Sequence, residues 1–422
     1  MHTLIMGTRQ THAKALAKTC LTMALAWIFI IGALLNSAAA QERFLPAASA
    51  VVLATSVHGQ GGRQAGLRQL DQAWRAHPED LNASLAYARA VFTLGLSEGD
   101  LRWFGSAKAA LQPWWLAEDL PADGLFLRGL VKQGFHAFDA GLQDINKAIA
   151  LAPRRAEFWS WRFALHLLLA DMASAQQDTQ EMQRLFGAEE ADVYRAVLLY
   201  RTGQPLVAVQ MLSRTVRSPN YQDASSQDWL GFHLGEAHRV AGQPALAIAV
   251  WSERLKVSAQ SHLLRLSLAE LLNQQGRFVQ AKAMAMNQRD LGSLTDALLM
   301  QALLACRGLK DADETRLASQ MAARLKAQAL RQESLIERPK LIYQIAYGQD
   351  MAAGLALSIE NWQLQKEPPD ALLFAQAALA RAQPRAAEPV VIWSEKTGYT
   401  DPKLGPLIQQ LKAHPGWSGP RS

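Results

Sequence analysis

The sequence has very few cysteines. Only two occur in 422 residues, whereas a disulfide-stapled small domain, a four-thiolate zinc site or an iron–sulfur cluster needs at least about four. Charge is also sparse, with 19% charged residues against 50% hydrophobic ones. An intrinsically disordered chain has the reverse balance, because it cannot bury enough apolar surface to offset its ordering entropy. The chain therefore folds, and side-chain packing must stabilise it.

Signals of catalysis are scarce as well. No H-E-x-x-H pair occurs, and His233 and His238, five residues apart, would lie on different faces of a helix. The glycine-rich run 59–62 lacks the spacing and the lysine of a phosphate-binding loop. A G-x-S-x-G pattern is centred on Ser97, but residues 88–94 before it have a helical pattern, whereas a nucleophile elbow needs a strand there. We predict no enzyme, no catalytic residue, no metal and no cofactor; a serine hydrolase using Ser97 is the weaker alternative.

The N-terminus has the pattern of an export signal. Residues 1–18 carry three basic and no acidic side chains, and residues 21–35 are almost entirely apolar. This run is shorter than the roughly 20 residues that a membrane-spanning helix needs. Ala38 and Ala40 then form an A-x-A site, which predicts cleavage before Gln41. We expect a periplasmic or secreted bacterial protein, with an uncleaved inner-membrane anchor as the alternative.

Cleavage would remove half of the excess positive charge. The whole chain has 43 Lys and Arg against 37 Asp and Glu, a formal net charge of +6, and loss of the three basic residues of the signal leaves 40 against 37. A nucleic-acid-binding protein would show a concentrated basic patch, whereas these charges are interspersed, so we expect no nucleic acid partner. The remaining cysteine, Cys306, lies in an apolar run and is expected to be buried, with a reactive or dimer-forming thiol as the alternative.

From about residue 64 onward apolar residues recur every three or four positions, which predicts helices. Small residues also repeat at long intervals. One series has intervals of 34, 33, 39 and 34 residues: Gly141, Ala175, Ala208, Ala247 and Ala281. A second series lies twelve residues before the first, with Phe163 in the one large position: Gly129, Ala196, Gly235 and Ala269. Small residues that recur in step predict two closely packed helices per unit. Glycines between the two series would end the first helix: Gly203, Gly242 and Gly276.

This spacing resembles the tetratricopeptide repeat (TPR), a helix–turn–helix unit of about 34 residues. The unit at residues 228–260 has Gly235 in its first helix, the turn 242–244, and then Ala247 and Trp251. The resemblance implies an all-α fold, a right-handed superhelical α-solenoid of stacked helix-turn-helix repeats, in which neighbouring pairs bury a continuous core. Roughly eight to ten such pairs are expected. The chain thus resembles an exported bacterial TPR protein.

The predicted organisation has five segments. They are a signal peptide (1–40), an extended N-terminal segment (41–63), a TPR-like helical repeat array (64–333), C-terminal TPR-like helical pairs (341–412) and a flexible tail (413–422). Residues 311–333 are expected to form one long helix, because acidic side chains at its start and basic ones later suit the helix dipole. Residues 334–340 contain Pro339 and are expected to link the array to the C-terminal pairs.

TPR proteins generally bind peptides or partner proteins on the concave face, which the first helix of each pair lines. By spacing, the lining positions here are Phe126, Gln133, Trp229, Phe232, Glu236, Arg239, Glu270 and Asn273. The aromatic members could anchor apolar side chains of a ligand, and the polar members could hold its backbone or a carboxylate. The alternative is that these residues only pack or face solvent, with Glu236 and Arg239 paired one turn apart.

The resemblance implies a non-catalytic scaffold that binds a protein or peptide partner in the periplasm or envelope. Membrane contact would occur only through an uncleaved N-terminal segment, as in an anchored accessory subunit of an envelope complex. One further cluster of aromatic residues lies near the start of the array: Trp103, Phe104, Trp114 and Trp115. Core packing explains such a cluster, and an exposed binding surface is the alternative, because tryptophan is enriched where partners bind.

Overall fold

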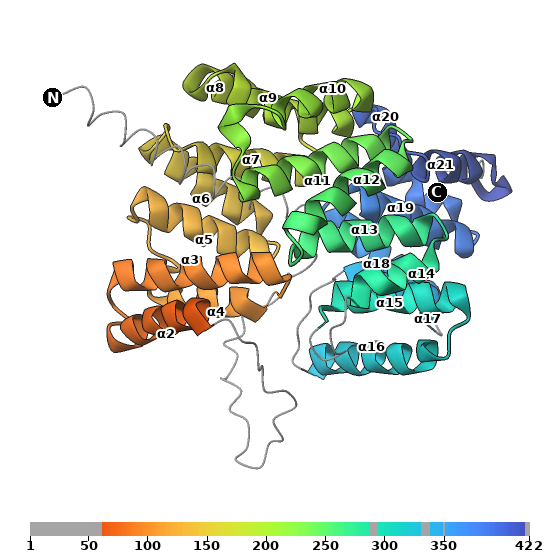
Figure 1. Cartoon of the computed structure of the whole chain (residues 1–422), viewed down its shortest axis with the longest axis horizontal. Coiled ribbons are helices and arrows are strands. Elements are labelled where there is room, and N and C mark those ends of the chain that lie inside the picture. Colours follow the sequence, from red (N-terminus) through yellow and green to blue (C-terminus); the bar gives the residue numbers. More distant parts are fainter. Residues whose placement is uncertain (1–60, 101, 287–293, 331–337, 349–350, 418–422) are drawn as a thin grey trace, which may run out of the picture.

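A computed structural model describes residues 61–100, 102–286, 294–330, 338–348 and 351–417. Within these ranges the regular elements are helices, and the predicted all-α fold is confirmed (Figure 1). The predicted signal peptide and its cleavage site at Ala38, Ala40 and Gln41 lie outside the described residues. Most of the predicted extended segment lies outside them too, and its last residues begin the first described helix.

The α-helices are, in chain order, α2 (Gly61–Ala76), α3 (Leu81–Glu98), α4 (Arg102–Ala110), α5 (Ala122–Gly134), α6 (Phe138–Leu151), α7 (Ala156–Leu168), α8 (Met172–Phe186), α9 (Ala188–Arg201), α10 (Pro205–Thr215), α11 (Ala224–Val240), α12 (Pro244–Val257), α13 (His262–Gln274), α14 (Phe278–Met286), α15 (Asp296–Leu309), α16 (Asp313–Leu330), α17 (Arg338–Tyr347), α18 (Met351–Leu364), α19 (Pro368–Ala380), α20 (Glu388–Thr397) and α21 (Leu404–Ala413). Short 3-10 helices include η2 (Gln112–Trp114), η3 (Pro219–Tyr221), η5 (Pro384–Ala387) and η6 (Pro415–Trp417).

The helices form pairs that stack in chain order. Helix α5 packs on α6, α7 on α8, α9 on α10, α11 on α12 and α13 on α14. Each pair also packs on the next, through α6 with α7, α8 with α9, α10 with α11 and α12 with α13. One such pair cannot bury its apolar face alone, so stacking makes the core continuous. This arrangement is the predicted α-solenoid.

Small residues permit close contact within the pairs, as the repeat predicts. A Cβ atom on Gly129 of α5 would lie 2.9 Å from the carbonyl oxygen of Gly141 on α6. A Cβ atom on Gly235 of α11 would overlap the indole nitrogen of Trp251 on α12. The turns also follow the prediction, because Gly203, Gly242 and Gly276 have φ values of +80°, +74° and +71°. A left-handed glycine therefore ends the first helix in three successive pairs.

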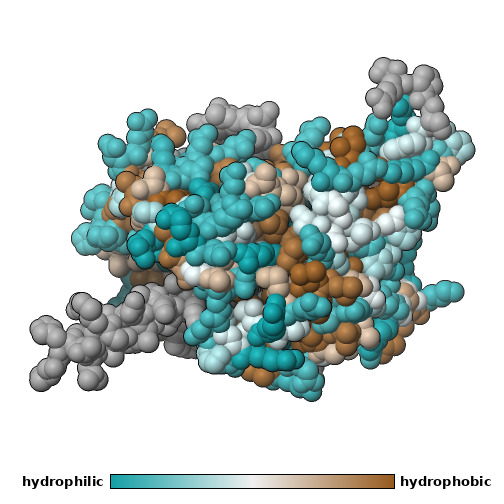
Figure 2. All heavy atoms as spheres, turned by 90° about the horizontal axis from the view of Figure 1, so that it is seen from above, coloured by the Kyte–Doolittle hydropathy of each residue, from teal (hydrophilic) through white to brown (hydrophobic). Residues whose placement is uncertain are grey.

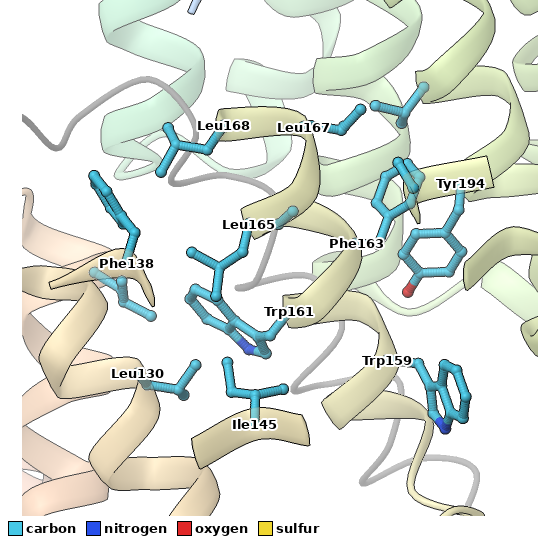
Figure 3. Close-up of a cluster of buried hydrophobic side chains, with 14 of the residues drawn as sticks. Leu130, Phe138, Ile145, Trp159, Trp161, Phe163, Leu165, Leu167, Leu168 and Tyr194 are labelled. Atoms are coloured by element: carbon cyan, nitrogen blue, oxygen red, sulfur yellow. The ribbon is translucent and has the colours of Figure 1, made fainter. Parts of the chain in front are cut away.

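Phe163, the one large residue in the small-residue series, fills space toward the next pair. In Figure 3, Trp161 and Leu165 of α7 point toward Leu130 and Ile145, whereas Phe163 points the opposite way toward Tyr194 of α9. The rings of Phe163 and Tyr194 make an edge contact with centroids 5.4 Å apart. Helix α7 is therefore apolar on both sides, because it is enclosed by the pairs before and after it.

The C-terminal block, residues 338–417, folds back onto the middle of the array. In Figure 1 its blue helices lie behind the green ones. The backbone N–H of Lys366 donates to the carbonyl of Leu168 at the end of α7, 2.9 Å away. A Cβ atom on Gly203 would lie 2.5 Å from the carbonyl oxygen of Gly398. Trp362 and Phe374 belong to the same hydrophobic cluster as the first helices of the array. The block thus packs on the side that the repeat assigns to the concave face.

The array also curves back on itself. Helix α3, near the N-terminal end, contacts α13. The contact is close, because a Cβ atom on Gly99 at the end of α3 would overlap the imidazole of His262 at the start of α13. The inner face is therefore enclosed by the curvature of the array and by the C-terminal block.

Other predicted features are found with shifted boundaries. The long helix expected at 311–333 is α16, which is described as far as Leu330. Helix α17 begins at Arg338, inside the predicted link. The predicted flexible tail includes η6, whose Trp417 packs on the main core. Cys306 is buried, as expected. Among the described helices none is long and apolar enough to cross a membrane.

Candidate functional site

Most of the residues predicted to line the concave face are buried by the protein itself. Five of the eight are almost fully buried: Phe126, Gln133, Trp229, Phe232 and Glu236. Phe126 packs on Phe158 with ring centroids 4.3 Å apart, and Trp229 contacts Tyr194 with centroids 5.9 Å apart. A partner could reach these five only by displacing other parts of the chain. Their role in partner binding stays a prediction.

Arg239 joins the array to the C-terminal block. Its guanidinium pairs with Glu236 at 2.9 Å, the one-turn pair expected from the sequence. The same group donates to Asp401 at 3.1 Å and to the Tyr399 hydroxyl at 3.4 Å. Burial alone would raise the pKa of Asp401, but Arg239 and the backbone N–H groups of Leu404 and Lys403 lower it. Arg239 thus already has internal partners on two elements.

The last two predicted residues lie on α13. The side-chain amide of Asn273 donates to the backbone carbonyl of Gln301 at 2.9 Å and to its side chain at 3.0 Å. Glu270 is partly buried. Burial raises its pKa, although Arg338 and Arg239 act in the opposite direction. The structure therefore brings Glu236, Arg239 and Glu270 into one electrostatic neighbourhood and directs Asn273 toward α15.

A buried charge cluster, which the sequence did not reveal, lies where the block meets the array. Arg201 at the end of α9 pairs with Glu367 at 2.9 Å, and both side chains are almost fully buried. Burial raises the pKa of Glu367 to about 7, although Arg201 lowers it. Nearby, Arg338 pairs with Asp370 at 3.0 Å, and the side-chain amide of Gln365 donates to Asp370 at 3.0 Å. No local pattern marks this cluster, because its members are far apart in the sequence.

Ser97 lies in the last turn of α3, and its hydroxyl donates to the carbonyl of Leu94 at 3.0 Å. The strand-to-helix turn that exposes a catalytic serine is not the local structure here. Among the described residues there is no group of three or more His, Cys, Asp or Glu side chains placed to hold a metal ion.

No protein-family model and no curated protein matches this sequence. Solved structures with a similar arrangement include yeast Tom70, with 11% identity over 84% of this chain and 85% of that chain and a TM-score of 0.41. Human IFIT1, solved as a dimer with m7Gppp-AAAA, has 11% identity over 84% and 87%, with a TM-score of 0.36. The TPR domain of P58(IPK) has 15% identity over 86% and 96%, with a TM-score of 0.20.

Such low scores decide nothing by themselves; the stacked pairs, the contacts at small residues and the glycine turns decide the fold. The chain has a TPR-like fold. Folds of this kind suggest protein-interaction scaffolds, although function resides in particular surfaces.

Two ion pairs recur in the TPR-like array. Arg128 of α5 pairs with Asp144 of α6 at 2.7 Å, and Arg162 of α7 pairs with Asp178 of α8 at 2.5 Å. Both arginines and both aspartates are one repeat apart in the sequence. This spacing was visible in the sequence and would have predicted a pair that joins the two helices of each unit. Burial raises the pKa of Asp178 to about 6, while Arg162 lowers it.

The aromatic cluster near the start of the array divides between core and surface. Phe104 is buried and stacks on Phe92 with centroids 4.8 Å apart. Trp103 donates from its indole N–H to Glu98 at 3.2 Å. Trp114 and Trp115 are half-buried in the turn between α4 and α5. Core packing therefore explains Phe104, while the other three keep exposed surface.

The outer face carries exposed apolar side chains and a cavity. Leu206 and Val207 at the start of α10, Leu246 at the start of α12 and Val279 at the start of α14 are exposed. Between α12 and α14 lies a cavity of about 320 Å³, with lining residues Ile248, Ser252, Leu268, Leu272, Arg277, Gln280, Ala283 and Met284. Figure 2 shows apolar patches breaking the polar surface on the face seen from above.

Proposed function

We propose that this chain is an exported, non-catalytic scaffold that binds a protein or peptide partner in the bacterial periplasm or envelope. The observation that carries the proposal is a TPR-like solenoid whose outer helices expose apolar side chains in consecutive repeats. Large apolar side chains exposed side by side on a folded protein are typical of interaction surfaces. The inner face, by contrast, is occupied by the chain's own C-terminal block.

The outer face can offer a partner a continuous surface. Leu206, Leu246 and Val279 lie near the first turns of α10, α12 and α14, the second helices of three successive pairs. A partner that spans these helices would bury apolar area at about 25 cal/mol per Å². The apolar cavity between α12 and α14 adds a place for one inserted side chain.

Crosslinking in the producing cell tests the scaffold proposal. A photoreactive amino acid at Leu246 or Val279 should give a discrete adduct with another protein, identified by mass spectrometry. Gln177, an exposed polar residue of α8, is the control position and should give less adduct. Absence of protein adducts at both apolar positions would contradict binding at this face.

Export is supported by the basic, apolar and small-residue order of residues 1–40. Intact-mass measurement of protein from the envelope fraction should give Gln41 as the first residue. Retention of Met1 in a membrane fraction would instead favour the anchored accessory subunit. Hydrolysis of ester substrates that is lost in Ser97→Ala would establish the hydrolase alternative.

A further inference from the structure

We propose that the turn between α4 and α5 is a rigid knob that inserts Leu116 into an apolar pocket of the partner protein, a pocket rimmed by basic side chains. This inference rests on the scaffold function proposed above and specifies where on the molecule the partner binds. The knob comprises residues 112–119, which follow α4 and contain η2.

Leu116 is 91% exposed, more than the other exposed large hydrophobic side chains of the described residues. It extends from a turn, whereas most others lie along helices. Burying a leucine side chain in a partner is worth roughly 1.5–3 kcal/mol. A leucine at the tip of a turn can enter a concave pocket, which a leucine on a helix face cannot do as deeply.

The turn is held in place by a buried arginine. The Nη1 group of Arg128 donates to the carbonyl oxygens of Trp114 at 2.8 Å, Trp115 at 3.3 Å and Ala117 at 2.6 Å. Its Nε and Nη2 groups each donate to a different carboxylate oxygen of Asp144, at 2.7 Å. This bidentate pair fixes the guanidinium plane. The three carbonyls, one on each side of Leu116 and one further back, therefore have fixed positions.

A rigid knob loses little conformational entropy when it binds. Ordering a mobile loop on binding costs about 0.5–1.5 kcal/mol per side chain, and here the fold has already ordered the backbone. The base of the knob is also fixed, because Lys108 lies over the ring of Trp115 at 5.3 Å and over that of Phe135 at 5.0 Å. Binding sites on rigid supports keep their geometry.

The charges beside Leu116 indicate the chemistry of the partner. Glu118 and Asp119 follow it directly and are exposed, and the structure shows no hydrogen bond or ion pair to either carboxylate within the described ranges. Two carboxylates beside the apolar tip oppose insertion into an anionic lipid surface. They complement a protein pocket with Lys or Arg at its rim, since such pairs steer association and fix orientation.

A photoreactive amino acid at position 116 tests the knob in the producing cell. The matched control is position 151, because Leu151 is also an exposed apolar residue, at 61%, but lies at the end of helix α6. We expect a discrete protein adduct at 116 that is stronger than at 151. The adduct should weaken when Glu118→Lys and Asp119→Lys are combined. An adduct with lipid, or equal adducts at both positions, would overturn the proposal.

Binding of the purified protein identified in that adduct supplies the quantitative test. Leu116→Ser should weaken binding at least tenfold, and Leu151→Ser should change it less than twofold. Unfolding midpoints should be the same for both variants and wild type, because both side chains are exposed. Equal affinity of Leu116→Ser and wild type would overturn the knob. Adducts at Leu246 or Val279 without any at 116 would also overturn it, while leaving the scaffold function standing.

Vesicle flotation separates the lipid alternative. Vesicles of phosphatidylcholine, with and without 30% phosphatidylglycerol, are the probes. Wild type and Leu116→Ser should both remain unbound, as expected for a protein-binding knob. Flotation of wild type that Leu116→Ser abolishes would show that the knob enters membranes and would overturn the proposal.

Discussion

At the scale of single residues, the contact of Gly235 with Trp251 is one of the closest in the core. Trp251 is completely buried, and its indole N–H donates to the carbonyl of Phe232 at 3.2 Å. Gly235→Val would place methyl groups where the indole lies, and the helices could separate only by losing that packing. We expect a loss of about 3 kcal/mol in the free energy of unfolding, measured by urea denaturation.

Gly105→Ala is the matched control for this substitution. Gly105 lies in α4, is exposed, and a Cβ atom there would have no neighbour within 4 Å. Alanine should raise stability by up to about 1 kcal/mol, because it favours the helix. Equal destabilisation by the two substitutions would show that helix propensity, and not close packing, governs these positions.

Single residues were also where the sequence predicted most accurately. Gly203, Gly242 and Gly276 have the left-handed conformation that their spacing requires, because a turn is a local structure. The aromatic residues Phe126, Trp229 and Phe232 were predicted to lie on first helices, and they do. Their burial could not be predicted, because periodicity places a side chain on a face but does not say what covers that face.

At the scale of helix pairs, the ion pair between Arg162 and Asp178 joins α7 to α8. Removing one partner of a buried pair leaves an uncompensated charge and costs roughly 3–5 kcal/mol. We expect Arg162→Met to destabilise the protein by about 3 kcal/mol at pH 8. The loss should be smaller at pH 5, because protonation of Asp178, whose pKa is already raised to about 6, then removes the charge.

A double-mutant cycle checks this account. The variant Arg162→Met with Asp178→Leu should recover most of the stability lost in the single variant, since no buried charge remains. Urea unfolding of all four proteins at both pH values gives the coupling energy. A double variant as unstable as Arg162→Met alone would mean that the pair does not account for the loss.

Helix pairs were predictable because each is built from residues close in the chain. The intervals near 34 residues fix which helices pair, and Arg128 with Arg162, and Asp144 with Asp178, follow the same interval. Phe163 departs from the series because the space it fills belongs to the neighbouring pair, next to Tyr194. Contacts between units thus alter the repeat at single positions without changing its period.

At the scale of the whole molecule, the pair of Arg201 with Glu367 makes closure of the C-terminal block depend on pH. Burial raises the pKa of Glu367 from 4.5 to about 7, so the folded state holds a proton that the unfolded chain releases. The contribution of this group is complete below about pH 4.5 and is lost as the pH rises through 7. Stability should fall by on the order of 2 kcal/mol between pH 5 and pH 8 from this group.

Glu367→Gln tests the pH dependence, because glutamine has the shape of the protonated side chain. Its stability should match wild type near pH 5 and exceed it at pH 8. Comparison at each pH cancels the contributions of Asp178 and His166, which also titrate in this range. Glu360→Gln, on an exposed part of α18, is the control and should leave the pH profile unchanged. Identical profiles for Glu367→Gln and wild type would contradict the assignment.

The return of the C-terminal block was the feature that the sequence could not predict. Residues 341–412 were expected to form further helical pairs, and their helices are present. Their position depends on contacts such as Arg239 with Asp401 and Lys366 with Leu168, which join residues more than a hundred positions apart. A repeat pattern describes each unit and its neighbours, and it contains no signal for contacts of this range.

That return also changes how the chain can reach its native state. An ordinary repeat array can fold unit by unit as it is made, because each unit needs only its neighbours. Here Arg201 and Glu367, 166 residues apart, must meet before the inner face is dry. Contacts of such long range slow folding, and ribosomes supply the N-terminal units first. The middle helices will therefore wait, with apolar surface exposed, for the last part of the chain to arrive.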